Sequence, residues 1–274
     1  MSSLPRERAQ RYNESYTHSM VLGTTTQQRQ HGGYQTYTIV PSSVTAKIPE
    51  AFSYTKAVAL AVGAGTAAGA LYSPSHFALP FPSVQRPTSA ANGTLIIWGA
   101  SSAVGLAAVQ QATLSGVEAI ATAGAHNHSL VSSLRASVVF DHKDPDVVSK
   151  VVAAAKGKSA LGIFDTISLP PTNQASIDIL ADLPDAKKLI VVLQPPFQEF
   201  DTKGAEIRPM FSAVITKNGV GDKIFGEWLP QVLESGLYKP YPEPNVVGKG
   251  LGDVQKGLDI TKRGVSASKT VVEA

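Results

Sequence analysis

Residues 94–110 read TLIIWGASSAVGLAAVQ. An apolar run with the length of a strand is followed by a turn of small residues and then by a helix-like pattern. Such a turn lets the backbone approach a ligand closely, and the following helix directs its first N–H groups toward that ligand. Strand, turn and helix in this order predict a site for the pyrophosphate of a dinucleotide.

The candidate phosphate-binding residues are the turn and the first residues of the helix: Gly99, Ala100, Ser101, Ser102, Ala103, Val104 and Gly105. The string departs from G-x-G-x-x-G, because only Gly99 and Gly105 are glycine. The serines are small enough to leave the backbone accessible, and we expect their hydroxyls to add donors to phosphate oxygens. The alternative is a purely structural turn, which any α/β domain contains.

Regular alternation of strands and helices surrounds this motif. Further apolar runs lie at 117–122, 137–140, 161–164 and 189–193. The clearest helix is DPDVVSKVVAAAKG, with Asp144 as its expected cap and an apolar face of Val147, Val148, Val151, Val152 and Ala155. Repeated βαβ units predict an α/β fold with a Rossmann-type, doubly wound parallel sheet within residues 92–239.

The regions on either side of this domain have other patterns. Residues 1–31 are polar and lack periodicity, so we expect them to be poorly ordered. Strands are expected within 33–48, a helix from Ser53 to about Tyr72, a strand at 210–215 and a helix at about 225–233. A last helix with Leu251, Val254 and Leu258 on one side precedes a short strand, KTVV. We expect these end pieces to pair with the strands at 33–48.

Composition and charge exclude several classes of protein. The net charge of +3 comes from 24 basic and 21 acidic residues that are scattered along the chain, which argues against nucleic acid as a partner. The absence of cysteine excludes thiolate nucleophiles and cysteine-ligated metals. The first residues lack an apolar signal-peptide core, and the longest apolar stretch is shorter than the roughly 18 residues of a membrane span. We therefore expect a cytoplasmic protein without a membrane partner.

Several ordered motifs share a resemblance that covers residues 30–274. They are GGYQTYTIVP, WGASSAVGLAAVQ, ATAGAHNHSLVSSL, VVFDHKDPDVV, GIFDTIS and GLGDVQKGLDITKRG. Together they resemble the medium-chain dehydrogenase/reductase superfamily, in particular its zinc-independent branch with the fungal trans-acting enoyl reductases. The resemblance implies a partial GroES-like subdomain from residues 32–79 and 240–274, since family members begin with a longer GroES-like domain. It also implies NADPH-dependent hydride transfer and no bound metal.

The end of the second strand is expected to set the choice of cofactor. Ala123 stands where NAD-specific relatives carry an acidic residue for the ribose hydroxyls, and a carboxylate there would repel a 2′-phosphate. The following residues, Gly124, Ala125, His126 and Asn127, are therefore candidate NADP-binding residues. The alternative for His126 and His128 is a solvated helix start.

Other candidate site residues come from the resemblance. His142 stands where related reductases carry a tyrosine against the adenosine phosphate, and an exposed loop histidine is the alternative. Val192, Leu193, Val265 and Ser266 are implied to line the cofactor, and Thr66 is implied to approach nicotinamide and substrate, with tight helix packing as the alternative. Asp165 and Ser168 end the fourth strand near the expected nicotinamide half, although Asp165 is equally suited to cap a helix or form an ion pair.

These observations predict an NADPH-dependent oxidoreductase acting on an activated C=C bond or a carbonyl, such as an enoyl reductase in polyketide biosynthesis. The alternative is a truncated paralogue that binds NADPH without catalysis. The resemblance implies a small or acyl-carrier-bound substrate, a polyketide synthase as partner, and a monomer or homodimer. No proton donor can be named, and His18, His31 and His76 are expected to be exposed.

Overall fold

The structure, a computed structural model, describes residues 19–24, 31–32, 37–90, 92–196 and 198–273. Its central sheet has six strands: β3 (Thr94–Trp98), β4 (Glu118–Ala123), β5 (Val138–Asp141), β6 (Ala160–Asp165), β7 (Leu189–Val192) and β8 (Glu206–Pro209). They lie in the order β5-β4-β3-β6-β7-β8, and every ladder is parallel. The strand order reverses between β3 and β6, so the ligand-binding switch point of this fold lies there. The predicted α/β fold is confirmed.

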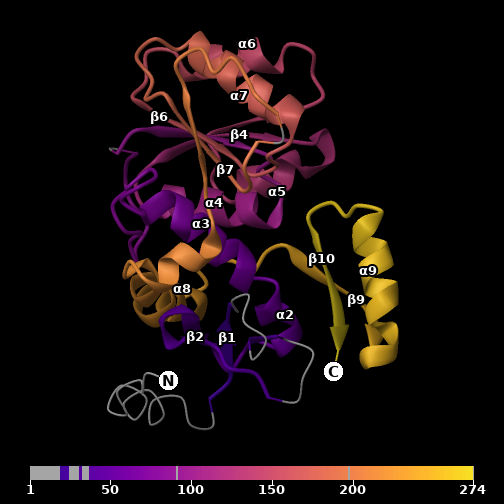
Figure 1. Cartoon of the computed structure of the whole chain (residues 1–274). Helices are drawn as coiled ribbons and strands as arrows, with labels where there is room; N and C mark the ends of the chain where they lie inside the picture. The colour runs from indigo at the N-terminus through magenta and orange to yellow at the C-terminus, as the bar shows by residue number, and fades with distance from the viewer. Residues whose placement is uncertain (1–18, 25–30, 33–36, 91, 197, 274) are drawn as a thin grey trace, which may run out of the picture.

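Helices cover both faces of this sheet (Figure 1). One face carries α4 (Ala103–Leu114) and α5 (His128–Ser133), and the other carries α6 (Val147–Ala155) and α7 (Pro170–Ala181). Side chains of β3 alternate between the two layers: Leu95 and Ile97 join the α4 layer, whereas Ile96 and Trp98 join the α6–α7 layer. The apolar runs are continuous because both faces of the strands are buried.

Two helices replace the single one expected between Ser53 and Tyr72. These are α2 (Tyr54–Val58) and α3 (Ala61–Tyr72), and the Ser53 hydroxyl caps the first by accepting the Lys56 N–H (3.2 Å), as predicted. Helix α3 packs against α4, where the Gln111 side chain donates to the Ala64 carbonyl oxygen (3.0 Å). This contact holds the Gly- and Ala-rich helix α3 beside α4, the helix that follows the turn.

The end pieces form two separate pairs of strands. Strand β1 (Val21–Gly23) pairs antiparallel with β2 (Thr45–Lys47), and β9 (Glu243–Lys249) pairs in parallel with β10 (Ser268–Glu273). The predicted pairing of the terminal strand with residues 33–48 is therefore wrong, and so is the expected lack of order at 21–23. Residues 33–36 lie outside the described residues. A π-helix (Asp222–Trp228) and α8 (Leu229–Glu234) replace the helix expected at 225–233.

Two local predictions need correction. Helix α6 begins at Val147 with Asp146 as its N-cap, while the Asp144 carboxylate accepts the Asp146 N–H (2.9 Å) in the preceding turn. Residues 212–216 form a 3-10 helix, because the last sheet strand is the polar β8 that precedes them. In the described chain, no helix is long and apolar enough to cross a membrane.

Helix α9 (Val254–Lys262) faces β9 and β10 with a different side from the one predicted. Leu251 and Leu258 are 77% and 53% exposed. Gly257 is the buried residue, and a Cβ on it would lie 3.2 Å from Val272 Cγ2. The close approach of helix and strands at a glycine turns the leucines away from this contact.

Candidate functional site

The turn between β3 and α4 is held rigidly against its neighbours. Gly99 has a φ of +77°, a left-handed conformation that favours glycine, and any side chain there would overlap Ile167. The Gly99 N–H donates to the Thr122 hydroxyl (3.1 Å), and the Ala100 N–H donates to the Thr122 carbonyl oxygen (2.8 Å). The backbone of the turn is thus fixed to the carboxyl end of β4.

Several amides of this turn have no partner within the described chain. They are the N–H groups of Ser101, Ala103 and Val104. They lie at the start of α4, which has 12 residues, so the dipole of the helix adds partial positive charge there. Unpaired N–H groups at a helix start are the donors that bind phosphate oxygens. The turn therefore has the chemistry that a pyrophosphate site requires.

The Ser102 hydroxyl has an internal role. Its oxygen accepts the Gly105 N–H (2.9 Å) as the N-cap of α4. It also lies 2.9 Å from Thr166 Oγ1, which donates its own proton to the carbonyl oxygens of Trp98 and Gly99. The Ser102 hydroxyl is thus already hydrogen-bonded within the chain, to the Gly105 N–H and to Thr166. Ser101 is partly exposed and remains a candidate.

Two glycines allow close backbone approach around the turn. A Cβ on Gly105 would overlap the Gly99 carbonyl oxygen and lie 2.6 Å from Ala100 Cα. A Cβ on Gly63, in α3, would lie 2.6 Å from the Ala103 carbonyl oxygen. The start of α4 therefore lies directly between the turn and α3, with no room for a side chain at Gly63 or Gly105.

Replacing Gly105 by Ala is expected to lower the free energy of unfolding by about 2 kcal/mol, because the added methyl group meets backbone atoms that must shift. Urea denaturation measures this loss. Gly226→Ala is the matched control, since a Cβ there has nothing within 4 Å. The control should change stability by less than about 1 kcal/mol. Equal effects of the two substitutions would contradict the close approach of turn and helix.

The residues predicted to hold the adenosine end lie together. A Cβ on Gly124 would be 3.0 Å from His126 Cε1 and 3.6 Å from His142 Cε1, so both imidazoles lie over this glycine. His126 Nε2 shares a hydrogen bond with Ser266 Oγ (2.9 Å), and Asn127 Nδ2 donates to the same oxygen (2.8 Å). The segment before β10 is thereby joined to the loop after β4, although 139 residues separate Asn127 from Ser266.

The end of β4 carries no carboxylate, but the neighbouring strand does. Ala123 is the partner of Asp141 in the parallel ladder of β4 and β5. Asp141 Oδ1 accepts the Lys143 N–H (3.0 Å), so this carboxylate organises the turn that carries His142. The sequence alone did not indicate that Asp141 lies beside Ala123, because their pairing depends on the register of two strands.

At the other half of the switch point, a buried carboxylate connects two loops. Asp165 is fully buried and accepts hydrogen bonds from the Ile167 and Ser168 N–H groups and from the Thr172 and Asn173 side chains, at 2.6–3.0 Å. Burial raises the pKa of Asp165, although these hydrogen bonds favour the charged form. The sequence left open whether Asp165 caps a helix or forms an ion pair. In the structure it accepts hydrogen bonds from its own loop and from the start of α7.

Ser168 extends this network to the end of β7. Its hydroxyl donates to the Asp165 carbonyl oxygen (2.8 Å) and accepts the Leu193 N–H (2.7 Å). Val192 is fully buried, and its carbonyl oxygen accepts the Met210 N–H (2.8 Å). The network fixes the loops at 166–169 and 193–194, which follow the carboxyl ends of adjacent strands.

Thr66 and Val265 occupy different environments. Thr66 is 8% exposed in α3 and lies three residues after Gly63, on the same helix face that meets Ala103. Val265 is 43% exposed. Thr66 therefore lies one turn after the residue of α3 that meets Ala103, and Val265 directly precedes Ser266, whose hydroxyl bonds His126.

The remaining histidines lie in different environments. His76 was expected to be exposed, but it is buried, because Nδ1 shares a hydrogen bond with Ser75 Oγ (3.0 Å) and Nε2 with the Pro209 carbonyl oxygen (3.3 Å). Burial lowers its pKa. His128 Nε2 is 3.2 Å from the Ala123 carbonyl oxygen. His18 lies outside the described residues.

Two threonines that hold the turn were not predicted from the sequence. Thr122 and Thr166 are buried and contact Gly99 from β4 and from the loop after β6. A polar residue near the end of an apolar strand was the available signal for Thr122.

Sequence comparison gives close relatives among fungal enzymes. The chain is 38% identical over 259 residues to the dehydrogenase orsE of Emericella nidulans, covering 89% of this chain and 72% of the relative. It is 35% identical over 243 residues to the trans-enoyl reductase himH of Aspergillus japonicus, covering 89% and 69%. No protein-family model matches the sequence.

Solved structures share the fold. An alcohol dehydrogenase superfamily protein from Novosphingobium aromaticivorans superposes with a TM-score of 0.69 at 19% identity, over 93% of this chain and 75% of that one. The chain belongs to the medium-chain dehydrogenase/reductase superfamily. Mycobacterial Rv1454c, solved in complex with NADPH, superposes with a TM-score of 0.62 at 19% identity, over 86% of this chain and 69% of that one. Membership of this superfamily makes the chain an oxidoreductase that uses a nicotinamide cofactor.

Within the described part of this dehydrogenase/reductase, no group of three or more His, Cys, Asp and Glu residues is arranged to hold a metal ion.

Proposed function

We propose that this chain is an NADPH-dependent oxidoreductase that transfers hydride to an activated carbon–carbon double bond or a carbonyl group. The observation that carries the proposal is the row of unpaired amides at Ser101, Ala103 and Val104, at the start of α4 and beside the switch point of the sheet. The complex of Rv1454c with NADPH supports the same class of cofactor.

Two groups of residues support the binding of such a dinucleotide. The turn after β3 offers donors to the pyrophosphate, and the imidazoles over Gly124 offer donors to the adenosine phosphate. When bound, the reduced nicotinamide supplies a hydride to an electrophilic carbon. The chain's own contribution is to bind and orient: the Asp165 and Ser168 network fixes the two loops at the nicotinamide half. Fixed orientation accelerates a reaction by removing the entropy of bringing the reactants together.

NADPH is expected to bind at least about tenfold more tightly than NADH, because a 2′-phosphate accepts charge-assisted hydrogen bonds where Ala123 offers no repelling carboxylate. Titration of cofactor fluorescence at one fixed ionic strength measures both affinities. His126→Asp should narrow the difference by placing a carboxylate over Gly124. Equal affinities of the unmodified chain for both cofactors would refute the preference.

For the substrate, we propose an α,β-unsaturated acyl thioester of secondary metabolism, delivered as a small molecule or on the carrier of a polyketide synthase. The relative himH is named a trans-enoyl reductase, and a structural neighbour is the enoyl reductase CurK, with a TM-score of 0.64. NADPH consumption with unsaturated thioesters, compared with quinones, tests this class. Tight NADPH binding without turnover of either substrate would support the alternative, a protein that binds the cofactor but does not catalyse.

A further inference from the structure

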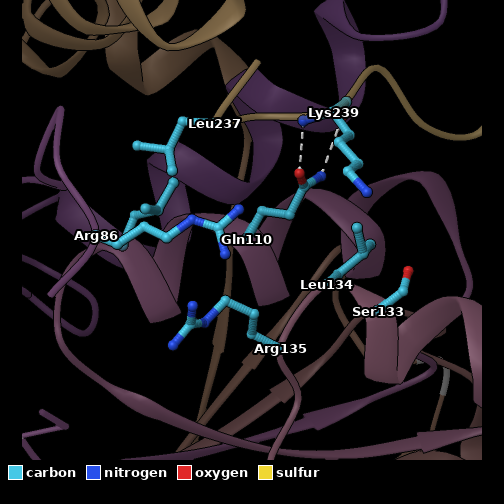
Figure 2. A pocket seen from close by; sticks show the side chains of 8 residues that line it. Arg86, Gln110, Ser133, Leu134, Arg135, Leu237 and Lys239 are labelled. Carbon is cyan, nitrogen blue, oxygen red and sulfur yellow. Dashed lines mark hydrogen bonds between the residues drawn. The ribbon is translucent and has the colours of Figure 1, made fainter. Parts of the chain in front are cut away.

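Figure 2 shows a small basic pocket lined by residues of α4, by the end of α5 and by the segments around Arg86 and Lys239. Its lining includes Arg86, Gln110, Ser133, Arg135 and Lys239. Its volume is about 30 Å³, which exceeds the roughly 10–15 Å³ that one water requires. The pocket therefore has room for one small polar group and not for a whole nucleotide.

Three cationic side chains line this pocket without a carboxylate. Neither Arg86, Arg135 nor Lys239 forms an ion pair with any described residue, and no Asp or Glu is part of the lining. Another pocket shares Arg135 and includes Glu118 in its lining, but Glu118 is paired with Lys158 (2.6 Å). Cations placed together repel one another, so an anion between them would relieve this repulsion.

The neutral polar groups of the pocket are already used within the chain. The Gln110 oxygen accepts the Lys239 N–H (2.8 Å), and the Gln110 amide donates to the Lys239 and Leu106 carbonyl oxygens (3.2 and 3.3 Å). The Ser133 hydroxyl donates to the Leu130 carbonyl oxygen (2.7 Å). The free hydrogen-bonding capacity of the pocket thus consists of the guanidinium and ammonium donors.

The backbone of two of these basic residues has a defined position beside the pocket. The backbone N–H and carbonyl oxygen of Lys239 form paired hydrogen bonds with the buried Gln110 side chain, as the dashed lines of Figure 2 show. Arg135 follows α5 with a φ of +79°, a position at which helices usually carry glycine or asparagine. A left-handed arginine is unfavourable for the backbone, so the local fold gives no reason for arginine at this position.

The pocket lies toward the amino ends of the strands, whereas the cofactor turn lies at their carboxyl ends. Helices α4 and α5 run back from the carboxyl ends of β3 and β4, and the pocket lies along the second half of α4 and after the end of α5. Gln110 is seven residues after Ala103, which corresponds to about 10 Å along a helix. An anion in this pocket would therefore bind separately from the dinucleotide.

We propose that this pocket binds a phosphate group, supplied either by free inorganic phosphate or by a small phosphate monoester. Two guanidinium groups and an ammonium group together match the charge and the several acceptor oxygens of a tetrahedral dianion. The binding is independent of the proposed oxidoreductase activity, because the pocket shares no residue with the cofactor turn.

The test is calorimetric titration of the chain with inorganic phosphate in chloride buffer, followed by phenyl phosphate as a monoester. Arg135→Asn is the decisive variant, because asparagine tolerates the left-handed backbone while removing the charge. Its affinity for phosphate should fall by about tenfold or more, with an unchanged or raised melting temperature. Arg263→Gln, an exposed arginine after α9, is the matched control and should bind phosphate normally.

Ala103→Glu distinguishes this pocket from the cofactor turn. Phosphate binding that survives Ala103→Glu but is lost in Arg135→Asn supports the pocket, while NADPH binding by Arg135→Asn should be unchanged. Tighter binding of phenyl phosphate assigns the site to an esterified ligand, and equal binding assigns it to free phosphate. The proposal is overturned if Arg135→Asn still binds phosphate, or if Ala103→Glu no longer does. It is also overturned if the unmodified chain binds no phosphate at concentrations up to about 10 mM.

Discussion

Replacing Ala103 by Glu is expected to weaken NADPH binding by about 100-fold or more, corresponding to about 2.7 kcal/mol. Ala103 is the first residue of α4, and its own amide is one of the unpaired donors of the turn. A carboxylate at this position competes for those donors and repels the pyrophosphate. Fluorescence titration with NADPH measures the loss.

The variant should nevertheless fold normally. A glutamate in the first turn of a helix interacts favourably with the helix dipole, by about 0.3–1 kcal/mol, so its melting temperature should be unchanged or slightly higher. Ala103→Gln has nearly the same size without the charge and should lose much less affinity than Ala103→Glu. Undiminished NADPH binding by Ala103→Glu would mean that the cofactor does not use this turn.

Replacing Asp165 by Ala is expected to lower the free energy of unfolding by about 4 kcal/mol. The carboxylate accepts two backbone N–H groups and the side chains of Thr172 and Asn173, and its removal leaves these buried donors without an acceptor. Urea denaturation at neutral pH measures the effect. Asp185→Ala, at an exposed position, is the control and should change stability by less than about 0.5 kcal/mol. A loss no larger than that of the control would show that the carboxylate is not needed.

The pH dependence of stability tests the protonation of Asp165. Burial raises its pKa above the ordinary 3.8, so the folded state keeps the proton to higher pH than the unfolded state. The stability contributed by this group is therefore fully present below 3.8 and is lost as pH rises through the folded pKa. Relative to Asp165→Asn, which does not titrate, the unmodified chain should lose stability over this range. A gain instead would show that the hydrogen bonds to the ionised form outweigh the desolvation.

The central sheet could be predicted because its strands are buried on both faces. Strands β3 to β7 coincide with continuous apolar runs that helix-length segments separate. Strand β8, which reads EIRP, was missed because it is short and polar at the edge of the sheet. Strand β9 was missed because Pro244 lies within it, and proline is tolerated in a two-stranded pair where one edge is free.

The site was predictable where it depends on local sequence and unpredictable where it depends on register. Small residues between β3 and α4 were enough to indicate the turn. The hydrogen bond of Ser102 to Thr166 could not be predicted, because Thr166 is 64 residues away and reaches Ser102 only when β6 pairs with β3. The same holds for Asp141, whose position beside Ala123 follows from the ladder of β4 and β5.

The alternation of β3 side chains gives a pair of spectroscopic reporters. Ile96 and Ile97 are consecutive, yet each is fully buried in a different layer. Methyl groups labelled at these two positions would monitor the two halves of the molecule separately in one NMR experiment. A disturbance that begins among α6 and α7 should reach Ile96 first, whereas one that begins at α4 should reach Ile97 first.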